Sequence, residues 1–486
     1  MCGISGVLAP VGRGTTQLQR DLVDAMVSTL GHRGPDASGT WVDPSGRMAL
    51  GHTRLAIVDL SEAGAQPMTS ADGRWTITYN GEIYNTDDLR RSLGSVSWRG
   101  HSDTEVLIEH IARYGVPATL KAAKGMFAFG CWDAHESELW LARDRFGEKP
   151  LYYGQHQGTF LFASELQALR AVPDFHPDID REALVEYFRW MHVPSPMTIY
   201  EGVSKLPPSH FLRVDQQAAI PEPQPYWSAQ DVAVNAQNVH DGIDTVDRLS
   251  DALDRAVGAQ MVADVPLGAF LSGGIDSSSV VAAMQRQSSV PVQTFTIGFS
   301  EPAYDESGYA AEVAEALGTD HTDLVVSPED AMQVIPELPL IYNEPFADAS
   351  QIPTFLLSRM AREHVTVALS GDGGDELFGG YDRYQQIELL ERIRALLPSS
   401  ARRMLGAALA RPPVERWDRL GSTLPRPLVP PGLRHRTGYR MHKVGNLLAA
   451  HQAPDTYASL MSIESGVGGL VLGADDTPAS LGIIPT

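Results

Sequence analysis

The sequence predicts two folds in succession: antiparallel β-sheets stacked on each other and flanked by helices over about residues 1–210, and a doubly wound parallel α/β domain over about residues 211–486. Three observations support this prediction. Short alternating strands dominate the first part, whereas strands and helices alternate with each other in the second. Two strands of the second part also end in loops of serine, glycine and acidic residues, as expected at the ligand-binding edge of such a sheet.

The first domain is expected to alternate helices, loops and short strands. Residues 22–30 have helical spacing, and residues 31–36 form a loop rich in glycine and proline. A strand over residues 75–79 opens into Asn80-Gly81, a dipeptide that is also typical of a hairpin turn. Cys131 lies in an apolar strand and is expected in the core. Further elements are a helix over residues 104–114 and strands over residues 126–132, 138–142, 150–153 and 159–163.

The second domain follows a proline-rich connection at residues 220–225 and is expected to begin with a helix over residues 246–262. A buried strand over residues 265–271 leads through a loop into a helix over residues 278–286. A strand over 292–298, a helix over 306–317 and a β-branched strand over 365–369 come next. This alternation is typical of a parallel doubly wound sheet.

The composition is that of a globular protein large enough for two or three domains, since 43% of the 486 residues are hydrophobic and 20% are charged. A formal net charge of −22 argues against nucleic-acid binding, which favours basic proteins. Cys2 and Cys131 supply no disulfide framework and suit a reducing cytoplasm. No apolar run reaches the length of a membrane span, and no signal peptide is recognisable. We therefore expect a cytoplasmic protein without nucleic-acid or membrane partners. Its oligomeric state is not readable from the sequence, and a homodimer stays open.

The loop after residues 265–271 has the features of an anion site. Free backbone N–H groups and the positive end of the helix dipole point at such a turn, glycines let an anion approach closely, and hydroxyl groups add donors. The turn has no Gly-Lys-Ser/Thr and is not a Walker A loop. Its acid makes sense if a cation such as Mg²⁺ bridges it to phosphate groups; an ordinary strand-to-helix turn is the alternative. The residues concerned are Ser272, Gly273, Gly274, Asp276, Ser277 and Ser278.

A second loop of this kind follows the strand over residues 365–369. It begins at Ser370-Gly371 and carries Asp372 and Asp375. In an open α/β sheet, ligands gather at the carboxyl ends of strands near a topological switch point. We therefore expect Asp276 and Asp375 to meet around one metal ion and its phosphate group. Capping of the next helix is the alternative for the acids of this loop, above all for Asp372.

Cys2 becomes the first residue of the mature chain if Met1 is removed, which is usual before a small residue. A terminal α-amine titrates near neutrality and lies beside its own side chain, so it can take the proton of the thiol and later pass it to a leaving amine. Such a nucleophile needs no catalytic histidine, and His32 and His52 are interpreted as loop residues. An incidental buried thiol is the alternative.

The terminal Cys-Gly-Ile is followed, in this order, by GHRGPD, HTRLAIVDL, YNGEIYN, SDTEVL and RDRFGEKPLYY. This set of motifs resembles the class II glutamine amidotransferase domain, which has the fold of an Ntn-hydrolase sandwich. The resemblance implies that Cys2 is the nucleophile that attacks the side-chain amide of glutamine. It further implies an oxyanion hole formed by the side-chain amide of Asn80 and the backbone N–H of Gly81.

The same resemblance implies that Arg54 binds the α-carboxylate of glutamine and that Glu82 and Asp103 hold its α-ammonium group. These residue types suit the task, because Arg can engage a carboxylate with two parallel hydrogen bonds and a zwitterion needs charges of both signs beside it. Each assignment has an ordinary alternative. Asn80-Gly81 is also a turn signal, Arg54 could form a surface salt bridge, and Asp103 could cap the following helix.

In the second domain, SGGIDSS is similar to the pyrophosphate loop of the N-type ATP pyrophosphatases. SGDGGDELFGGY resembles the synthetase domain of glutamine-hydrolysing asparagine synthetases. The resemblance implies that ATP and Mg²⁺ bind at the two loops and that Leu271 and Ile297 contact the adenosine. It implies Glu344 as the base for the attacking ammonia and Asp348 as a contact of the acyl-adenylate. Core positions for the first pair, and loop acids without a further role for the second, are the alternatives.

The implied reaction is the ATP-dependent amidation of L-aspartate to L-asparagine through β-aspartyl-AMP, with AMP, pyrophosphate and glutamate as the other products. Ammonia from glutamine would travel inside the protein, because free ammonia becomes protonated in bulk water. Two alternatives stay open: an amidotransferase that acts on another carboxylate, in a peptide, antibiotic or polysaccharide precursor, and a glutaminase with an inactive synthetase half. Family members continue beyond Leu472 into a helical segment that supplies a lysine near the ATP phosphates. This chain does not contain that segment, so the second domain is expected to be truncated at its carboxyl end.

Overall fold

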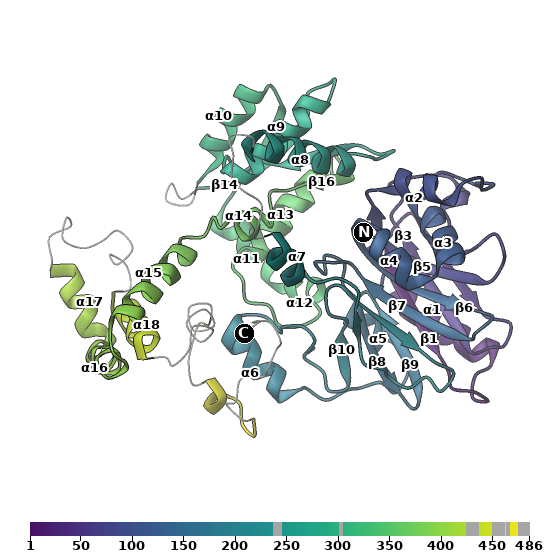
Figure 1. Cartoon of the computed structure of the whole chain (residues 1–486), viewed down its shortest axis with the longest axis horizontal. Helices are drawn as coiled ribbons and strands as arrows, with labels where there is room; N and C mark the ends of the chain where they lie inside the picture. The colour runs from purple at the N-terminus through teal and green to yellow at the C-terminus, as the bar shows by residue number, and fades with distance from the viewer. Residues whose placement is uncertain (237–244, 301–304, 424–436, 450–461, 463–466, 475–486) are drawn as a thin grey trace. The chain divides into compact units, whose positions relative to one another are not determined.

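The computed structural model describes residues 1–236, 245–300, 305–423, 437–449, 462 and 467–474. These residues fall into two compact units (Figure 1). The first unit consists of Met1–Ala183 and Val193–Gly371, and the second of Leu184–His192 with the described part of Asp372–Thr486. The predicted glutamine site and the first phosphate loop therefore belong to the same unit.

Two six-stranded antiparallel sheets form the amino-terminal part of the first unit (Figure 1). The first sheet has the order β10 (Val203–Lys205), β8 (Tyr152–His156), β9 (Thr159–Ala163), β1 (Gly3–Leu8), β3 (Met48–Arg54) and β2 (Ala37–Val42). The second has the order β12 (Gln224–Pro225), β11 (His210–Val214), β7 (Glu138–Arg143), β6 (Gly125–Asp133), β5 (Trp75–Ile83) and β4 (Met68–Thr69).

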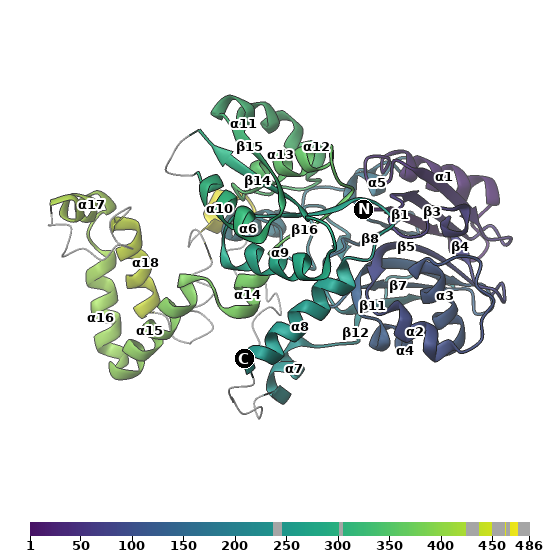
Figure 2. The same ribbon diagram turned by 90° about the horizontal axis from the view of Figure 1, so that it is seen from above.

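Helices cover the outer faces of both sheets, so the layers follow the order helix, sheet, sheet, helix (Figure 2). α1 (Thr16–Ser28) and α5 (Leu166–Arg170) pack on the first sheet. α2 (Thr86–Leu93), α3 (Asp103–Tyr114) and α4 (Val116–Ala122) lie on the side of the second sheet. This arrangement confirms the predicted sandwich of stacked antiparallel sheets flanked by helices.

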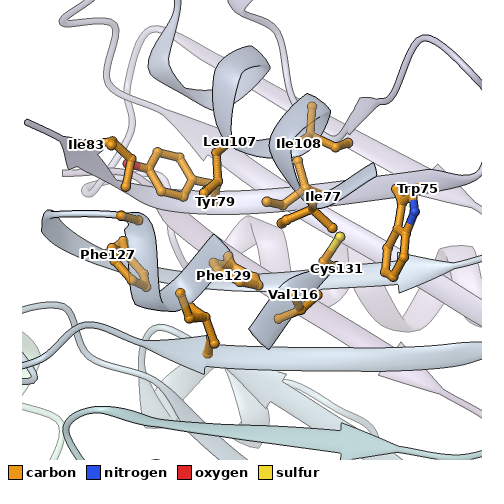
Figure 3. Packing of buried hydrophobic residues seen from close by; sticks show 14 of the residues in the cluster. Trp75, Ile77, Tyr79, Ile83, Leu107, Ile108, Val116, Phe127, Phe129 and Cys131 are labelled. Atoms are coloured by element: carbon orange, nitrogen blue, oxygen red, sulfur yellow. The ribbon is translucent and has the colours of Figure 1, made fainter. Parts of the chain in front are cut away.

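Separate apolar cores fill the layers. Ile4, Leu50, Trp132 and Phe162, all almost completely buried, belong to the core between the two sheets. A second core lies between β5 and β6 on one side and α3 and α4 on the other (Figure 3). Cys131 is fully buried in this second core, as predicted from its apolar strand.

β5 extends further than the sequence suggested. The predicted strand ended at Tyr79, and Asn80-Gly81 was the start of a loop or a hairpin turn. Instead, Asn80 pairs with Ala128 and Gly81 with Phe127 in the antiparallel ladder with β6. An added Cβ at Gly81 would lie 2.3 Å from the carbonyl oxygen of Met126, so this position has no room for a side chain. The hairpin interpretation is therefore wrong, and this dipeptide is held on the rigid edge of a sheet.

The later part of the first unit contains a four-stranded parallel sheet. Its order is β15 (Asp320–Val326), β14 (Gln293–Phe299), β13 (Leu267–Phe270) and β16 (Val367–Leu369). The chain moves outward from β13 through β14 to β15 and then returns to the other side of β13. The topological switch point therefore lies between β13 and β16, the two strands that precede the predicted phosphate loops.

Helices cover both faces of this parallel sheet, as the doubly wound prediction requires. α8 (Thr245–Gln260), α9 (Ile275–Gln287) and α10 (Ser307–Leu317) contribute to one apolar cluster, and α11 (Pro328–Val334) and α13 (Gln351–Ala361) contribute to clusters that contain β14 and β15. α9 begins at Ile275, three residues before the predicted start. The glycine loop is correspondingly shorter, and Asp276, Ser277 and Ser278 lie in the first turn of the helix.

Four further helices of the second unit are α15 (Asp382–Leu396), α16 (Ser399–Ala410), α17 (Val414–Thr423) and α18 (Thr437–Ala449). α18 packs against α15, α16 and α17. The short helix α14 (Gly374–Phe378) carries Asp375 and precedes them. Within the described ranges, no helix combines the length and the apolar character needed to cross a membrane.

Candidate active site

One pocket in the first unit gathers all six residues that were predicted to handle glutamine. Cys2, Arg54, Asn80, Gly81, Glu82 and Asp103 line it. They come from the amino-terminal segment, the end of β3, the end of β5 and the start of α3. Residues that are far apart in the sequence therefore meet where the ends of β1, β3 and β5 lie together.

Hydrogen bonds of Cys2 and of the two residues that follow it fix its position. Gly3 N donates to Thr53 Oγ1 at 3.1 Å and Ile4 N donates to Ser164 Oγ at 3.0 Å, which anchors the start of β1. The carbonyl of Cys2 accepts a hydrogen bond from Arg33 Nε at 3.0 Å. The thiol itself accepts a bond from Leu55 N at 3.4 Å. The sulfur is thus held at the pocket while its own backbone is tied to the sheet.

The protonation of this segment is governed by burial. Burial raises the pKa of the Cys2 thiol, so the thiolate needs a nearby proton acceptor. The α-amine at the chain start has a pKa lowered to about 6, chiefly by burial. An amine with such a pKa is mostly neutral at pH 7 and can accept a proton. The α-amine of Met1 is thus mostly neutral, which is the state that the α-amine of Cys2 would need as a base after removal of Met1.

Two hydrogen-bond donors of β5 point into the pocket without a bond to β6. The side-chain nitrogen of Asn80 is buried and has no partner among the described residues. Tyr79 N donates to Gln66 Oε1 at 2.7 Å and Ile83 N donates to Asp103 Oδ2 at 3.0 Å, so both N–H groups face away from β6. Because alternate residues of a strand direct their N–H groups to the same edge, the N–H of Gly81 faces the same way. The pair offers two neutral donors to an oxyanion.

Arg54 also lines the pocket. Its Nη1 donates to the carbonyl of Ser61 at 2.9 Å, and its Nη2 donates to the carbonyl of Asp59. These two bonds use backbone oxygens and no carboxylate, so the guanidinium keeps its positive charge uncompensated by them. The surface salt-bridge alternative does not describe Arg54, because no carboxylate pairs with it among the described residues.

Asp103 opens α3 but does not cap it. The side chain of Ser102 caps the helix by accepting a bond from Glu105 N. Asp103 Oδ2 instead accepts bonds from Tyr79 Oη at 2.7 Å and from Ile83 N at 3.0 Å. Beside it, Glu82 Oε1 is buried and has no partner among the described residues. The two acids thus lie together at the pocket, and the capping alternative for Asp103 is wrong.

Glu82 should make the stability of the protein depend on pH. Burial, and next the charge of Asp103, raise its pKa from 4.5 to about 7. The folded state therefore binds this proton more tightly than the unfolded state, and stability is lost as the pH rises from the unfolded toward the folded pKa. We expect Glu82→Gln to stabilise the protein by about 2 kcal/mol more at pH 8 than at pH 5.5. Thermal unfolding at both pH values tests this, with the exposed Glu312→Gln as the control, and an equal change at both pH values would contradict it.

Sequence reasoning missed two basic residues at this site. Lys149 lines the pocket, is buried, and donates to the sulfur of Met1 at 3.0 Å. Arg33 donates to the backbone of Cys2 and to Glu165 Oε1 at 2.8 Å. Arg33 lies in the motif GHRGPD and Lys149 in the motif RDRFGEKPLYY, so these two motifs could have indicated both residues. His52 was interpreted as a loop residue, but it lies in β3 with Nε2 3.2 Å from the carbonyl of Tyr79, and burial lowers its pKa to about 3.

The two predicted phosphate loops of the parallel sheet approach each other closely. An added Cβ at Gly371 would lie 2.6 Å from the backbone nitrogen of Ser277. Gly273 has a φ of +79°, and a Cβ there would lie 2.7 Å from the backbone of Tyr309. Gly371 is therefore needed for the approach of the two loops, and Gly273 for the approach of the first loop to α10. The adjacent Ser370 links β16 to Gly371.

The hydroxyl groups of the first loop form a small network. Ser277 Oγ accepts a bond from Ser272 N at 3.2 Å and lies 3.0 Å from Ser272 Oγ. Gly274 N donates to Ser272 Oγ at 3.3 Å. Ser278 Oγ is buried without a partner among the described residues, at the amino end of α9. An orphaned hydroxyl at the positive end of a 13-residue helix fits the phosphate groups of a nucleotide.

The remaining predicted contacts of the nucleotide differ in their surroundings. Leu271 is almost completely buried in the cluster of α9 and α10, whereas Ile297 is half-buried against the cluster of α11 and α13. Asp276 lies in the first unit and Asp375 in the second, so their meeting at one metal ion remains a prediction. No group of three metal-ligating acids, histidines or cysteines exists among the described residues. Mg²⁺ commonly needs only one or two carboxylates when phosphate oxygens complete its shell.

Glu344 is held by the amino-terminal part of the unit. It forms an ion pair with Lys205 at the end of β10, and both side chains are about one-seventh exposed. Ile199 N donates to Glu344 Oε2 at 3.3 Å, and the neighbouring Asn343 accepts a bond from Gln167 N at 2.8 Å. Asp348 is exposed and accepts a bond from Ser350 N at 2.8 Å, which shapes the turn before α13. Glu344 is thus a paired acid, and its role as a base stays a prediction.

Comparison with known proteins matches each of the two parts of the chain to a protein family. Residues 1–227 match the family profile described as glutamine amidotransferase domain, and residues 248–458 match the profile described as asparagine synthase. The first profile ends at residue 227 and the second begins at residue 248, and the boundary near residue 210 stays a prediction.

Individual relatives match this chain over most of its length. Asparagine synthetase [glutamine-hydrolyzing] 1 of Bacillus subtilis is 37% identical over 83% of this chain and 62% of its own length. A protein of Methanocaldococcus jannaschii, provisionally named asparagine synthetase [glutamine-hydrolyzing] 2, is 36% identical over 82% of this chain and 78% of its own length. A protein of Gibberella zeae named amidase chry2 is 32% identical over 80% of this chain and 61% of its own length. The chain thus spans less than two thirds of the length of the Bacillus relative.

Proposed function

Because this chain belongs to the family of glutamine-hydrolysing asparagine synthetases, we propose that it transfers the amide nitrogen of glutamine to the β-carboxyl group of L-aspartate in an ATP-dependent reaction. The observation that carries the proposal is the pocket that Cys2 lines together with the unpaired side-chain nitrogen of Asn80, the guanidinium of Arg54 and two acids. The gathered residues match, one for one, the needs of a thiol that attacks the amide of an amino acid.

In the first half-reaction, Cys2 Sγ attacks the side-chain carbonyl carbon of glutamine after its proton has moved to the α-amine that removal of Met1 exposes. The oxyanion is stabilised by Asn80 Nδ2 and Gly81 N–H. The amine then returns the proton to the leaving nitrogen, ammonia departs, and water releases glutamate from the thioester. Arg54 holds the α-carboxylate of glutamine, and Glu82 with Asp103 holds its α-ammonium group.

In the second half-reaction, a β-carboxylate oxygen of aspartate attacks the α-phosphorus of ATP, and pyrophosphate leaves. Ser272, Gly273, Gly274, Ser277 and Ser278 on the first loop, with Ser370 and Gly371 on the second, bind the phosphate groups, and Leu271 and Ile297 contact the adenosine. Mg²⁺, held by Asp276 and Asp375 with the phosphate oxygens, would neutralise phosphate charge. Ammonia then attacks the acyl carbon of the adenylate while Glu344 accepts a proton, AMP leaves, and Asp348 orients the acyl group.

Lys205 positions Glu344 for this step. It joins the first sheet to the proposed base through a largely buried ion pair, and its loss leaves Glu344 without that partner. We expect Lys205→Met to lower ammonia-dependent asparagine formation by roughly 100-fold, because a displaced Glu344 accepts the proton of the attacking ammonia less efficiently. Glutamate release from glutamine should change less than about twofold, since it depends on a different pocket.

Two matched variants control this experiment. Lys205→Arg keeps the positive charge and should recover most of the asparagine formation. Lys121→Met replaces an exposed lysine on α4 and should leave both activities unchanged. Equal loss of glutaminase and synthetase activity in Lys205→Met would indicate general unfolding and contradict a positioning role.

The direct test of the proposed function is pyrophosphate release by the purified full chain with ATP, Mg²⁺, ammonia and L-aspartate. Aspartate-dependent release, together with glutamate release from glutamine in a parallel assay, is expected. Glutamate release without pyrophosphate under any of these conditions would refute the amidation of aspartate and leave a glutaminase.

A second acceptor class follows from the fungal relative. A protein whose name is amidase matches this chain over almost the same extent as the named asparagine synthetases. The alternative is therefore an amidotransferase that acts on another carboxylate, in a peptide, antibiotic or polysaccharide precursor. Pyrophosphate release that needs such a carboxylic acid in place of aspartate would establish this alternative.

A further inference from the structure

Asp59 is an unusual residue behind the glutamine pocket. It is almost completely buried and has a φ of +58°, a left-handed conformation that residues other than glycine rarely adopt. Its Oδ1 accepts bonds from the backbone and side chain of Ser61 at 3.1 and 2.5 Å, and its Oδ2 accepts a bond from His101 N at 2.9 Å. Many interactions thus hold one strained backbone position.

The strained position matters because it connects two parts of the pocket. The carbonyl of Asp59 accepts a hydrogen bond from Nη2 of Arg54, the proposed ligand of the glutamine carboxylate. The side chain of Asp59 binds the backbone of His101, two residues before Asp103, the proposed ligand of the ammonium group. A shift of Asp59 would therefore move Arg54 and Asp103 relative to each other.

Asp264 holds this junction from outside the amidotransferase sandwich. Its Oδ2 accepts two hydrogen bonds, from Asp59 N and from His101 Nε2, each at 2.8 Å. Its own backbone nitrogen donates to the carbonyl of Ile57 at 2.9 Å. Three bonds thus connect one residue to both segments that end at the glutamine head group. Asp264 lies three residues before β13, the strand that leads into the first phosphate loop.

We propose that Asp264 is a positioning residue for the glutamine pocket: it fixes Asp59 and His101, and through them the spacing between Arg54 and Asp103. This inference rests on the proposed glutaminase function of the pocket. It assigns part of the glutamine affinity to a residue of the ATP-binding part of the chain, which touches neither glutamine nor Cys2.

The binding of L-glutamine tests this directly. Isothermal titration of the full chain that carries Cys2→Ala measures the Kd without consumption of the ligand. Adding Asp264→Ala removes the shared acceptor oxygen, and we expect the Kd to rise about tenfold, since a misplaced Arg54 weakens carboxylate binding. Adding Asp264→Asn instead keeps a carbonyl oxygen that can accept both bonds, so the Kd should stay within about twofold of the parent.

Asp247→Ala, an exposed change on α8, is the control and should leave the Kd unchanged. In chains with Cys2 intact, Asp264→Ala should raise the KM for glutamine by the same factor with kcat almost unchanged, while ammonia-dependent pyrophosphate release persists. A normal Kd in Asp264→Ala, or an equal loss in Asp264→Asn, would overturn the inference and leave the proposed function intact. Failure of the parent to bind glutamine at all would overturn both.

Discussion

Replacement of Cys2 by alanine is expected to lower glutamate release from glutamine by at least about 10⁴-fold, because the nucleophile is lost while only the oxyanion donors and substrate contacts remain. Ammonia-dependent pyrophosphate release should persist in the same variant, since the phosphate loops lie on a different sheet. Steady-state assays of glutamate and of pyrophosphate on one preparation measure both effects.

Cys131→Ala is the matched control for this prediction. Cys131 is buried between β5, β6 and α3 and does not line the pocket, so its replacement should leave glutamate release within a few-fold of the parent. Substantial glutaminase activity in Cys2→Ala, or a comparable loss in Cys131→Ala, would contradict the assignment of the nucleophile.

Replacement of Asn80 by alanine is expected to lower kcat for glutamine hydrolysis by roughly 10²- to 10³-fold with a small change in KM. The structural reason is that Asn80 Nδ2 is buried without a protein partner, so its hydrogen bond is available to charge that develops on the substrate. An interaction made only with the oxyanion affects kcat and leaves ground-state binding almost intact.

Asn85→Ala controls for a general disturbance of this segment. The side-chain nitrogen of Asn85 donates to the carbonyl of Ala122 at 3.1 Å, and the residue lies outside the pocket. Its replacement should change kcat by less than about threefold. A rise in KM without a fall in kcat for Asn80→Ala would show that this side chain binds glutamine and does not stabilise the oxyanion.

The sequence was sufficient to predict the fold class and the membership of the glutamine pocket. Alternating apolar residues identified β6, β7 and β9 to within one or two residues, because strands with one buried face repeat every two residues. The ordered motifs named six of the residues that line the pocket, and the Ser-Gly loops correctly marked the switch point between β13 and β16.

Local sequence signals failed where tertiary contacts decide. Asn80-Gly81 has the strongest turn preference of any short pair, yet pairing with β6 keeps both residues in a strand. The start of α9 was predicted too late, because Asp276 and Ser277 favour loops and caps when they are considered alone. Neighbours in the folded chain overrode the preference of the residues in both cases.

Long-range partners were not predictable for a simpler reason. Lys205 and Glu344 are 139 residues apart, and Asp59 and Asp264 are 205 apart, so no periodic pattern connects them. Each pair becomes visible only when the sheets have packed. The structure therefore identifies residues that the sequence alone did not, namely those that hold Glu344 and the glutamine pocket in place.

The most direct test of the central claim is the fate of the glutamine amide nitrogen. The purified full chain is supplied with ATP, Mg²⁺, L-aspartate, glutamine labelled with heavy nitrogen at the amide, and an excess of unlabelled ammonium. We expect asparagine whose amide carries far more label than the ammonium in solution, because ammonia released in the glutamine pocket reaches the adenylate within the protein. Asparagine labelled only to the level of the free ammonium, or glutamate formed without any asparagine, would contradict the account.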